Sequence, residues 1–262
     1  MNTNDTFLEI LRQSRTEIKP AIFSKLDDAP PDLNAAYDAQ DRLHKLLTHE
    51  LGNLAGYKIG CTTPVMQEYL KIKHPCAGAV FEKTVYREPA ALSFASFIKP
   101  GVECEIAVHI SEDMPHGETE MPEEAILKYI HACSASIEIV DARMPDFSSL
   151  STPILVADDF FNAGVVLGAP VTEWKSIDLA SIVGTLSVNG IKSGEGLGSF
   201  ILGHPIKALS WLIKHLNERG TSLKAGEFVT LGSVVQTEWI SEPQTEVTIE
   251  FEGLGRASVQ FV

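Results

Sequence analysis

The sequence predicts an α+β fold, in which a helical section comes first and an antiparallel or mixed β-sheet follows. Two N-terminal segments have helical periodicity, and from about residue 55 short β-rich runs dominate. Strands and helices do not alternate regularly, so a parallel βαβ architecture is not expected. With 262 residues, 44% of them hydrophobic, the chain can bury a full core. We expect an N-terminal helical section over residues 1–54 and one compact β-rich catalytic core over residues 55–262.

Helices are predicted where apolar residues recur at helical spacing between start and stop signals. The segment 32–51 begins at Asp32 after two prolines and places Leu43 and Leu47 on one stripe. The segment 204–218 has the same spacing and ends at Gly220. The other predicted helices cover residues 4–18 and 122–134.

Strands are predicted from β-branched and alternating runs between turn signals. The Asn189-Gly190 pair between two such runs is a strong hairpin signal. The remaining predicted strands cover residues 56–59, 78–81, 84–86, 100–110, 136–141, 163–168, 227–231, 246–251 and 257–262.

The predicted strand 100–110 alternates so regularly that its two faces can be assigned. Val102, Cys104 and Ile106 lie on an apolar face, while Glu103 and Glu105 share the other face. Carboxylates at i and i+2 are roughly 7 Å apart along a strand and can converge on one cation. A half-exposed strand with solvated acids is the alternative.

A third glutamate, Glu138, favours the metal site over that alternative. It stands between Ile137 and Ile139 in a β-branched run typical of a buried strand. A carboxylate is costly there unless it is paired or bound to metal. Three carboxylates without Cys or His at zinc-like spacing favour a hard ion, Mg²⁺ or Mn²⁺.

Charge and terminal composition limit the class of protein. Asp and Glu total 35 against 21 Lys and Arg, a net charge of -14, which argues against nucleic-acid binding. The sequence contains no signal-peptide pattern and no apolar run of membrane-spanning length. We therefore expect a cytoplasmic protein whose four scattered cysteines are reduced.

Seven segments in order carry a resemblance to one family. They resemble the 2-keto-4-pentenoate hydratase and 4-oxalocrotonate decarboxylase family of the fumarylacetoacetate hydrolase superfamily. The segments are Gly56 to Met66, Val102 to Ala107, Ile137 to Arg143, Ala157-Asp158, Val166 to Gly168, Leu202 to Pro205 and Lys224 to Glu227.

The resemblance implies a core of the fumarylacetoacetate hydrolase C-terminal type, a mixed sheet or β-roll, and a Mg²⁺ or Mn²⁺ enzyme. Its E-x-E pair and third glutamate match Glu103, Glu105 and Glu138, and its active-site lysine matches Lys58. The family also implies homo-oligomers, in some cases complexed with a paralogous decarboxylase or hydratase. Without the resemblance, a surface lysine on a strand is the simpler interpretation of Lys58.

The chemistry open to such an ion defines the expected reactions. A 2-oxo acid can chelate the ion, which then stabilises an enolate on the keto oxygen. A 2-hydroxy-2,4-dienoate could then take up water, as in a hydratase of aromatic-compound degradation, with Lys58 as acid and base. The alternatives are a 2-oxo acid decarboxylase, an acylpyruvate or β-diketone C–C hydrolase, and a non-catalytic partner subunit.

The chain departs from the family pattern at two places. Cys76 stands where the family commonly carries an aspartate after proline, so Glu82 is a candidate for the missing acid. Asp159-Phe160-Phe161-Asn162 replaces a small polar run and predicts a more apolar pocket.

Two further residues are candidates for substrate contact, and two histidines are not. Arg143 could clamp a substrate carboxylate, or instead pair with Asp141 or Asp146. Ser233 falls where the family places a loop near substrate. His109 and His204 are predicted to be structural, the first hydrogen-bonded and the second a cap or packing residue.

Overall fold

The computed structural model describes residues 3–23, 29–117 and 121–262, and it confirms an α+β fold with N-terminal helices and mixed sheets. The helices are α1 (Thr3–Thr16), α2 (Leu33–Leu51), α3 (Pro64–Leu70), α4 (Glu123–Ile126), α5 (Thr152–Ala157) and α6 (Pro205–Glu218). The strands are β1 (Leu54–Gly60), β2 (Cys76–Phe81), β3 (Val85–Arg87), β4 (Ala90–Leu92), β5 (Pro100–Ile110), β6 (Ile130–Asp141), β7 (Asn162–Leu167), β8 (Val183–Val188), β9 (Ile191–Leu197), β10 (Phe228–Ser233), β11 (Glu238–Trp239), β12 (Thr245–Phe251) and β13 (Gly255–Phe261).

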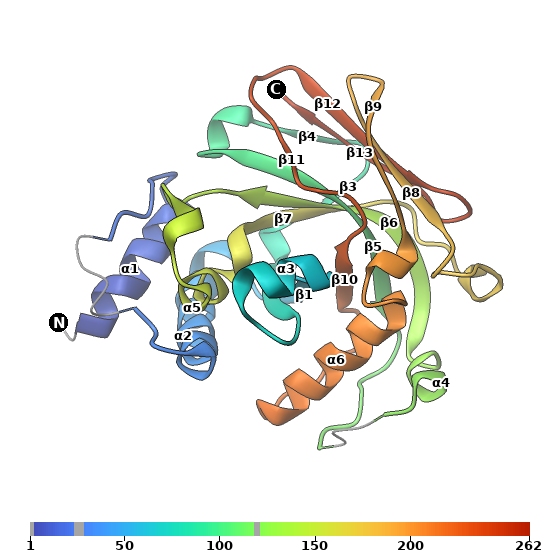
Figure 1. Ribbon diagram of the computed structural model, residues 1–262, viewed down its shortest axis with the longest axis horizontal. Helices are drawn as coiled ribbons and strands as arrows, with labels where there is room; N and C mark the ends of the chain where they lie inside the picture. Colours follow the sequence, from blue (N-terminus) through green and yellow to red (C-terminus); the bar gives the residue numbers. More distant parts are fainter. Residues whose placement is uncertain (1–2, 24–28, 118–120) are drawn as a thin grey trace.

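The strands form two sheets that share the main core. The larger sheet has the order β2-β1-β10-β5-β6-β7-β3, with β11 added beside β5, and the smaller has the order β4-β13-β12-β8-β9. Figure 1 shows the smaller sheet at the top, α1, α2 and α5 grouped at one side, and α6 below. The apolar face of β5, with Cys104 and Ile106, packs in one cluster with Ile249 and Phe251 of β12. The glutamate face of β5 is therefore turned away from the smaller sheet.

Helix α2 forms where the sequence predicts it, because both of its ends are capped. The Asp32 side chain accepts from Ala35 N at 2.9 Å, and Gly52 ends the helix with φ 84°. Its buried stripe includes Leu43 and Leu47, which pack with residues of α1 and α5 in a second apolar cluster. The Asn189-Gly190 hairpin between β8 and β9 is also confirmed, with φ 49° and 76° at the two turn residues.

One strand pairing joins two segments that lie far apart in the sequence. Strand β1 runs parallel to β10, with Lys58 opposite Thr230, and β10 is in turn antiparallel to β5. Lys58 thus reaches the same sheet as Glu103 and Glu105 through a strand from the last part of the chain.

The predicted helix over 122–134 is wrong for most of its length. The chain is helical only at Glu123–Ile126, and strand β6 begins at Ile130. Small residues such as Ala132 and Ser134 carry no strand signal, but they lie opposite β5 in continuous register, with Ala132 facing His109. Pairing with a long neighbouring strand has outweighed the local pattern. Residues 118–120, shortly before this segment, lie outside the described residues.

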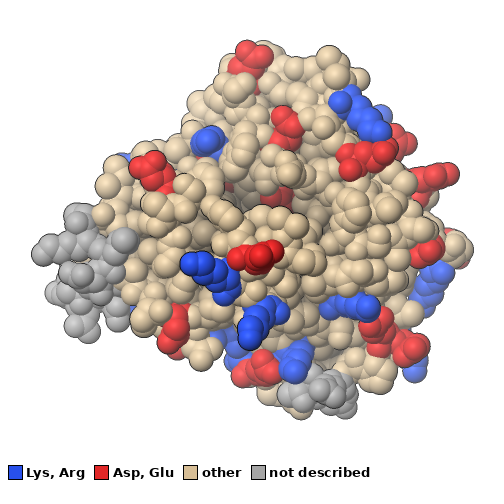
Figure 2. All heavy atoms as spheres, viewed as in Figure 1, with Lys and Arg blue, Asp and Glu red and all other residues tan. Residues whose placement is uncertain are grey.

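No helix in the described ranges is long and apolar enough to cross a membrane. On the face shown in Figure 2, acidic and basic side chains are interspersed.

Candidate metal centre and active site

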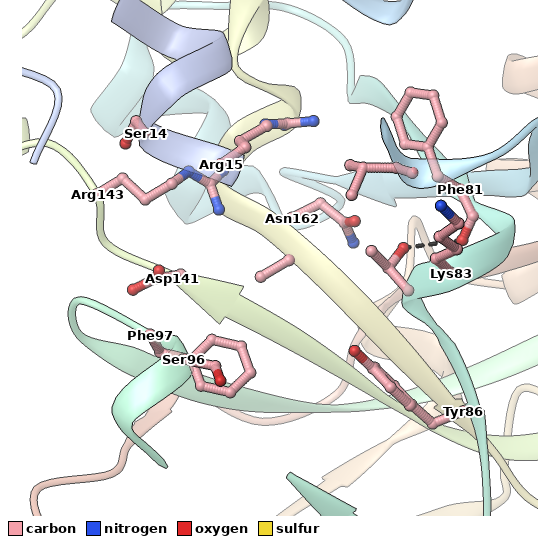
Figure 3. Close-up of a pocket in the computed structure, with 13 residues that line it drawn as sticks. Ser14, Arg15, Phe81, Lys83, Tyr86, Ser96, Phe97, Asp141, Arg143 and Asn162 are labelled. Atoms are coloured by element: carbon pink, nitrogen blue, oxygen red, sulfur yellow. Dashed lines mark hydrogen bonds between the residues drawn. The ribbon is translucent and has the colours of Figure 1, made fainter. Parts of the chain in front are cut away.

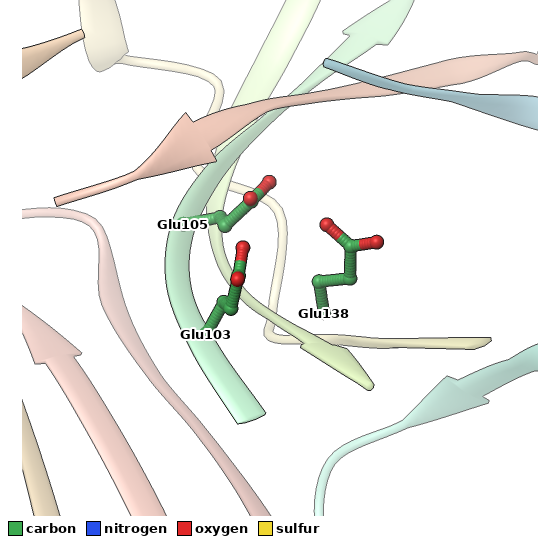
Figure 4. Close-up of side chains that lie close together, drawn as sticks. All are labelled: Glu103, Glu105 and Glu138. Carbon is green, nitrogen blue, oxygen red and sulfur yellow. The ribbon is translucent and has the colours of Figure 1, made fainter. Parts of the chain in front are cut away.

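Strands β5 and β6 bring three glutamates together. Glu103 lies directly opposite Glu138 in the antiparallel pair, and Glu105 follows two residues along β5 on the same face. One carboxylate oxygen from each residue lies within 4.8 Å of the other two. Figure 4 shows the three side chains rising from the two strands toward a common space.

The hydrogen bonds hold one oxygen of each carboxylate. Glu103 Oε1 accepts from Thr237 Oγ1 at 2.5 Å, and Glu105 Oε2 accepts from Gly232 N at 3.2 Å. Glu138 Oε1 accepts from Asn162 Nδ2 at 2.9 Å.

The other oxygens of the two buried glutamates have no partner. Glu105 and Glu138 are both 0% exposed, and Glu105 Oε1 and Glu138 Oε2 are buried without a hydrogen bond. Leaving a buried charged oxygen unpaired is costly unless a ligand satisfies it. The three carboxylates therefore fit a hard divalent cation, which prefers oxygen ligands.

The electrostatics of the cluster agree with this donor set. Burial and the nearby Glu138 and Glu103 carboxylates raise the pKa of Glu105 well above its usual value. Burial also raises the pKa of Glu138 to about 7, against the opposing effect of Lys58. Without an ion, the cluster is a site where negative charge is held unfavourably.

Lys58 is the buried cation of this cluster. Its side chain is 4% exposed, and Nζ lies 3.2 Å from Glu138 Oε1. Burial lowers the pKa of Lys58, but Glu138, Glu103 and Glu105 outweigh it and hold the pKa above its usual value. The structure thus brings Lys58 and the three glutamates into one group.

The loop from Asp158 to Phe161 is strained beside this group. Asp159, Phe160 and Phe161 have φ values of 52°, 50° and 69°, a region that non-glycine residues enter at a cost of about 1–3 kcal/mol each. The Phe160 ring centroid lies 6.0 Å from Lys58 Nζ. The loop therefore presents an aromatic ring to the buried ammonium group.

Buried ion pairs hold that loop in place. Arg15 of α1 contacts Asp158 at 3.1 Å and Asp159 at 2.8 Å, and His44 of α2 contacts Asp159 at 2.8 Å. His44 and Arg15 lower the pKa of Asp159 in spite of its burial, and Ala79 N also donates to its carboxylate. The N-terminal helices thus fix a loop that borders the glutamate cluster.

Three of the residues predicted near substrate make other contacts, although Ser233 lies opposite Glu105 across β10 and β5. Arg143 is 2% exposed and pairs with Asp158 at 2.8 Å, not with Asp141 or Asp146. The Ser233 hydroxyl bonds the backbone of Cys104. Glu82 is exposed and accepts from Asn53 N at 2.9 Å. Since Lys58 pairs with Gly78, Glu82 lies about 13 Å along the strand from it.

The cysteine at the position of the missing acid is buried. Cys76 is 1% exposed and lies opposite Gly60 at the end of the β1–β2 pair. The Cys76 thiol and burial raise the pKa of the neighbouring Cys61 well above its usual value, so Cys61 offers no anion. All four cysteines are free.

His109 and His204 both make structural contacts. His109 lies 2.9 Å from Ser134 Oγ, and burial lowers its pKa to about 4. His204 Nδ1 accepts from Ile206 N at 3.1 Å and caps α6.

Asn162, Thr237 and Gly232 hold the glutamates but were not predicted as site residues. Gly232 lies in β10 and Thr237 directly precedes β11, both far along the chain, and nothing in their local sequence indicates that they meet Glu105 or Glu103. Asn162 lies in the run that departs from the family pattern, which was the available signal.

Comparison with known proteins gives a consistent result. Residues 71–262 match the family described as Fumarylacetoacetate (FAA) hydrolase C-terminal. A 2-hydroxyhexa-2,4-dienoate hydratase of Comamonas testosteroni is 31% identical over 97% of this chain and 94% of its own length. A 2-keto-4-pentenoate hydratase of Paraburkholderia phymatum is 31% identical over 95% of this chain and 93% of its own.

The fold is also that of a solved structure. The 4-oxalocrotonate decarboxylase from Pseudomonas putida G7, complexed with magnesium and adipate, has a TM-score of 0.90 at 22% identity, covering 100% of this chain and 99% of that chain. Fold and site together define an α+β enzyme whose relatives are hydratases and decarboxylases. The chain belongs to the fumarylacetoacetate hydrolase C-terminal family.

Proposed function

We propose that this protein is a divalent-cation-dependent hydratase that adds water to a 2-hydroxy-2,4-dienoate. The observation that carries the proposal is the buried ammonium of Lys58 in contact with Glu138, one of the two glutamates of the cluster that retain an unpaired buried oxygen. Glu103, Glu105 and Glu138 would hold Mg²⁺ or Mn²⁺. When bound, the ion would accept the oxygens of a 2-oxo acid and stabilise negative charge on the keto oxygen.

Lys58 supplies the acid and base in this proposal. An ion on the glutamates offsets the carboxylate charges that hold the proton on Nζ, while burial of the side chain remains. Lys58 then holds its proton less tightly and can donate it to C5 while the 2-hydroxyl group loses its proton to solvent, which gives the keto form. The same amine can next take a proton from the water whose hydroxide adds at C4, and C3 takes up a proton from solvent, so that one water is consumed in total.

Two observations support a dienoate with one carboxylate over the substrate of a decarboxylase. A 4-oxalocrotonate-like acid carries a second carboxylate that would need its own partner. Arg143, predicted as a clamp, is committed to Asp158, and Phe160 presents an aromatic ring beside Lys58. Both named hydratases are also 31% identical to the chain, against 22% for the decarboxylase of known structure.

The division into residues 1–54 and 55–262, assembly into homo-oligomers or with a paralogue, and a cytoplasmic location belong to the same proposal. The Arg15 and His44 contacts indicate that the two sections act as one unit.

The test is a substrate panel with metal-loaded protein. It contains 2-hydroxypenta-2,4-dienoate, 2-hydroxyhexa-2,4-dienoate, 4-oxalocrotonate and an acylpyruvate, with detection of the 4-hydroxy-2-oxo acid, CO₂ and the cleaved acid. We expect hydration of a dienoate. CO₂ from 4-oxalocrotonate without hydration would establish a decarboxylase instead, and no turnover on any member would favour a non-catalytic subunit.

Lys58→Met gives a direct test of the proton-transfer role. We expect it to keep metal binding and lose about 10²- to 10⁴-fold in kcat. Lys175→Met, which removes a surface lysine beside Trp174, is the matched control and should keep full activity. Wild-type kcat in Lys58→Met would show that this residue moves no proton.

A further inference from the structure

A cavity lies close to the glutamate cluster, with Asn162 between the two. It has a volume of about 200 Å³ and opens between α1, β3 and the ends of β6 and β7. Figure 3 shows Arg143, from the loop just after β6, and Tyr86, from β3, reaching toward it, with Asn162 at its wall.

The pleat of β3 and β7 separates this cavity from the glutamate side. Val85 and Val165 pack in a cluster with Ala107, which shares the glutamate face of β5. Tyr86 follows Val85 and therefore points to the opposite face, where its ring lies beside Gly164. Val85 and Val165 thus lie on the glutamate side of Tyr86, and Asn162, which lines the cavity and bonds Glu138, lies at the boundary between the two spaces.

Two buried polar groups at the cavity have no partner. Ser14 is 2% exposed, and its Oγ makes no hydrogen bond. Arg143 is also 2% exposed and uses NH2 to bond Asp158, but its Nε makes no hydrogen bond. Both residues line the cavity, and buried donors of this kind are normally satisfied.

The charge around the cavity favours an anion. Arg15, Lys83 and Arg143 line it, against the single acid Asp141 among the lining residues. Both Asp141 oxygens accept from the backbone, Oδ1 from Lys99 N at 2.6 Å and Oδ2 from Ile98 N at 3.1 Å, so this acid is already satisfied. Arg15 and Arg143 are already paired with Asp158 and Asp159, so a ligand here meets the ammonium group of Lys83 and the two unused donors.

We propose that this cavity binds a small carboxylic acid. One carboxylate oxygen accepts from Arg143 Nε–H and the other from the Ser14 hydroxyl, while the Tyr86 hydroxyl meets the far end of the molecule. A volume of about 200 Å³ suits a short-chain acid. The site is independent of the reaction proposed above.

Asn162 couples this cavity to the glutamates. It lies on the cavity wall, and its Nδ2 donates to Glu138 Oε1 at 2.9 Å. A bound carboxylic acid that shifts Asn162 would alter its hydrogen bond to Glu138. The carboxylic acid and a divalent cation on the glutamates would then change each other's affinity by the same factor.

The test uses butanoate, which has no 2-oxo group and cannot chelate a metal as a 2-oxo acid does. Calorimetry on metal-free protein should show saturable binding of one butanoate per chain. Affinity should fall at least threefold in Ser14→Ala and in Tyr86→Phe, and at least tenfold in Arg143→Lys, which keeps a cation beside Asp158. The matched controls Ser149→Ala and Tyr129→Phe, at residues outside the cavity lining, should leave butanoate affinity unchanged.

A second readout tests the coupling. Mg²⁺ affinity measured in butanoate and in chloride of equal ionic strength should differ at least twofold in wild type, and the difference should vanish in Ser14→Ala. Absence of saturable butanoate binding would overturn the proposal, as would equal affinity in wild type, Ser14→Ala and Tyr86→Phe. These results do not depend on whether the protein hydrates a dienoate.

Discussion

Replacing Glu105 by glutamine should have opposite effects on the metal-free and the metal-loaded protein. Two unit charges 4.8 Å apart repel by about 3 kcal/mol at an effective dielectric constant near 20. Glu105→Gln removes two of the three repulsions in the cluster while keeping the side-chain oxygen that accepts from Gly232 N. Lys58 and partial protonation already relieve part of this strain, so we expect a gain of about 1–3 kcal/mol in the free energy of unfolding of the metal-free protein.

The same substitution should weaken Mg²⁺ binding by at least about tenfold, or 1.4 kcal/mol. Thermal unfolding with EDTA and with Mg²⁺ separates the two effects, at about 2–4 °C per kcal/mol for a chain of this size. The melting temperature should rise in EDTA, and the increase caused by Mg²⁺ should shrink.

Glu227→Gln is the matched control. Glu227 is a partly buried glutamate outside the cluster, whose pKa is also raised by burial. It should leave Mg²⁺ affinity unchanged. Glu105→Gln with wild-type Mg²⁺ affinity and no gain of stability in EDTA would refute the assignment of Glu105 as a metal ligand.

Three further predictions concern pH and the buried thiol. Because the pKa of Glu138 is raised to about 7, Mg²⁺ must displace a proton at lower pH, and calorimetry should show affinity falling up to about tenfold from pH 7 to 6. Burial lowers the pKa of His215 to about 4, below about 6.5 in the unfolded chain, so the unfolded state gains the extra proton as pH falls from 6.5 to 4. The folded state therefore becomes less stable as the pH falls through this range. Urea unfolding should show the free energy of unfolding falling by about 1–2 kcal/mol, since the ring is partly exposed, and His215→Gln should not show this decrease. Cys76→Asp should raise the hydration rate of 2-hydroxypenta-2,4-dienoate above that of Cys76→Ser; a lower melting temperature with no gain in rate would contradict a role for an acid there.

The elements that could be predicted from the sequence are those whose signals are local. The cap at Asp32 and the Asn189-Gly190 turn each depend on a few neighbouring residues, and both occur where predicted. The start of β6 could not be predicted, because Ala132 and Ser134 become strand residues only by pairing with β5. Neither segment contains a sequence signal for the parallel pairing of β1 with β10.

The site shows the same division. Alternation along β5 placed Glu103 and Glu105 on one face, and the buried character of its neighbours singled out Glu138. The commitment of Arg143 to Asp158 depends on a loop with three left-handed residues, which no propensity favours. The distance between Glu82 and Lys58 could not be predicted, because it depends on the register of the β1–β2 pair, and the sequence does not reveal that register.

The position of β10 in the larger sheet sets the order in which the protein can assemble during synthesis. Strand β10 lies between β1 and β5, so β1 has no place beside the glutamate strands until β10 has left the ribosome. Lys58 cannot take its place opposite Thr230 until about 170 further residues have been synthesised, and closing a loop of that length is slow. The glutamates of β5 and β6 can pair long before this. A nascent chain thus acquires its carboxylates early and its ammonium group last, so the proposed active site is completed only among the final events of folding.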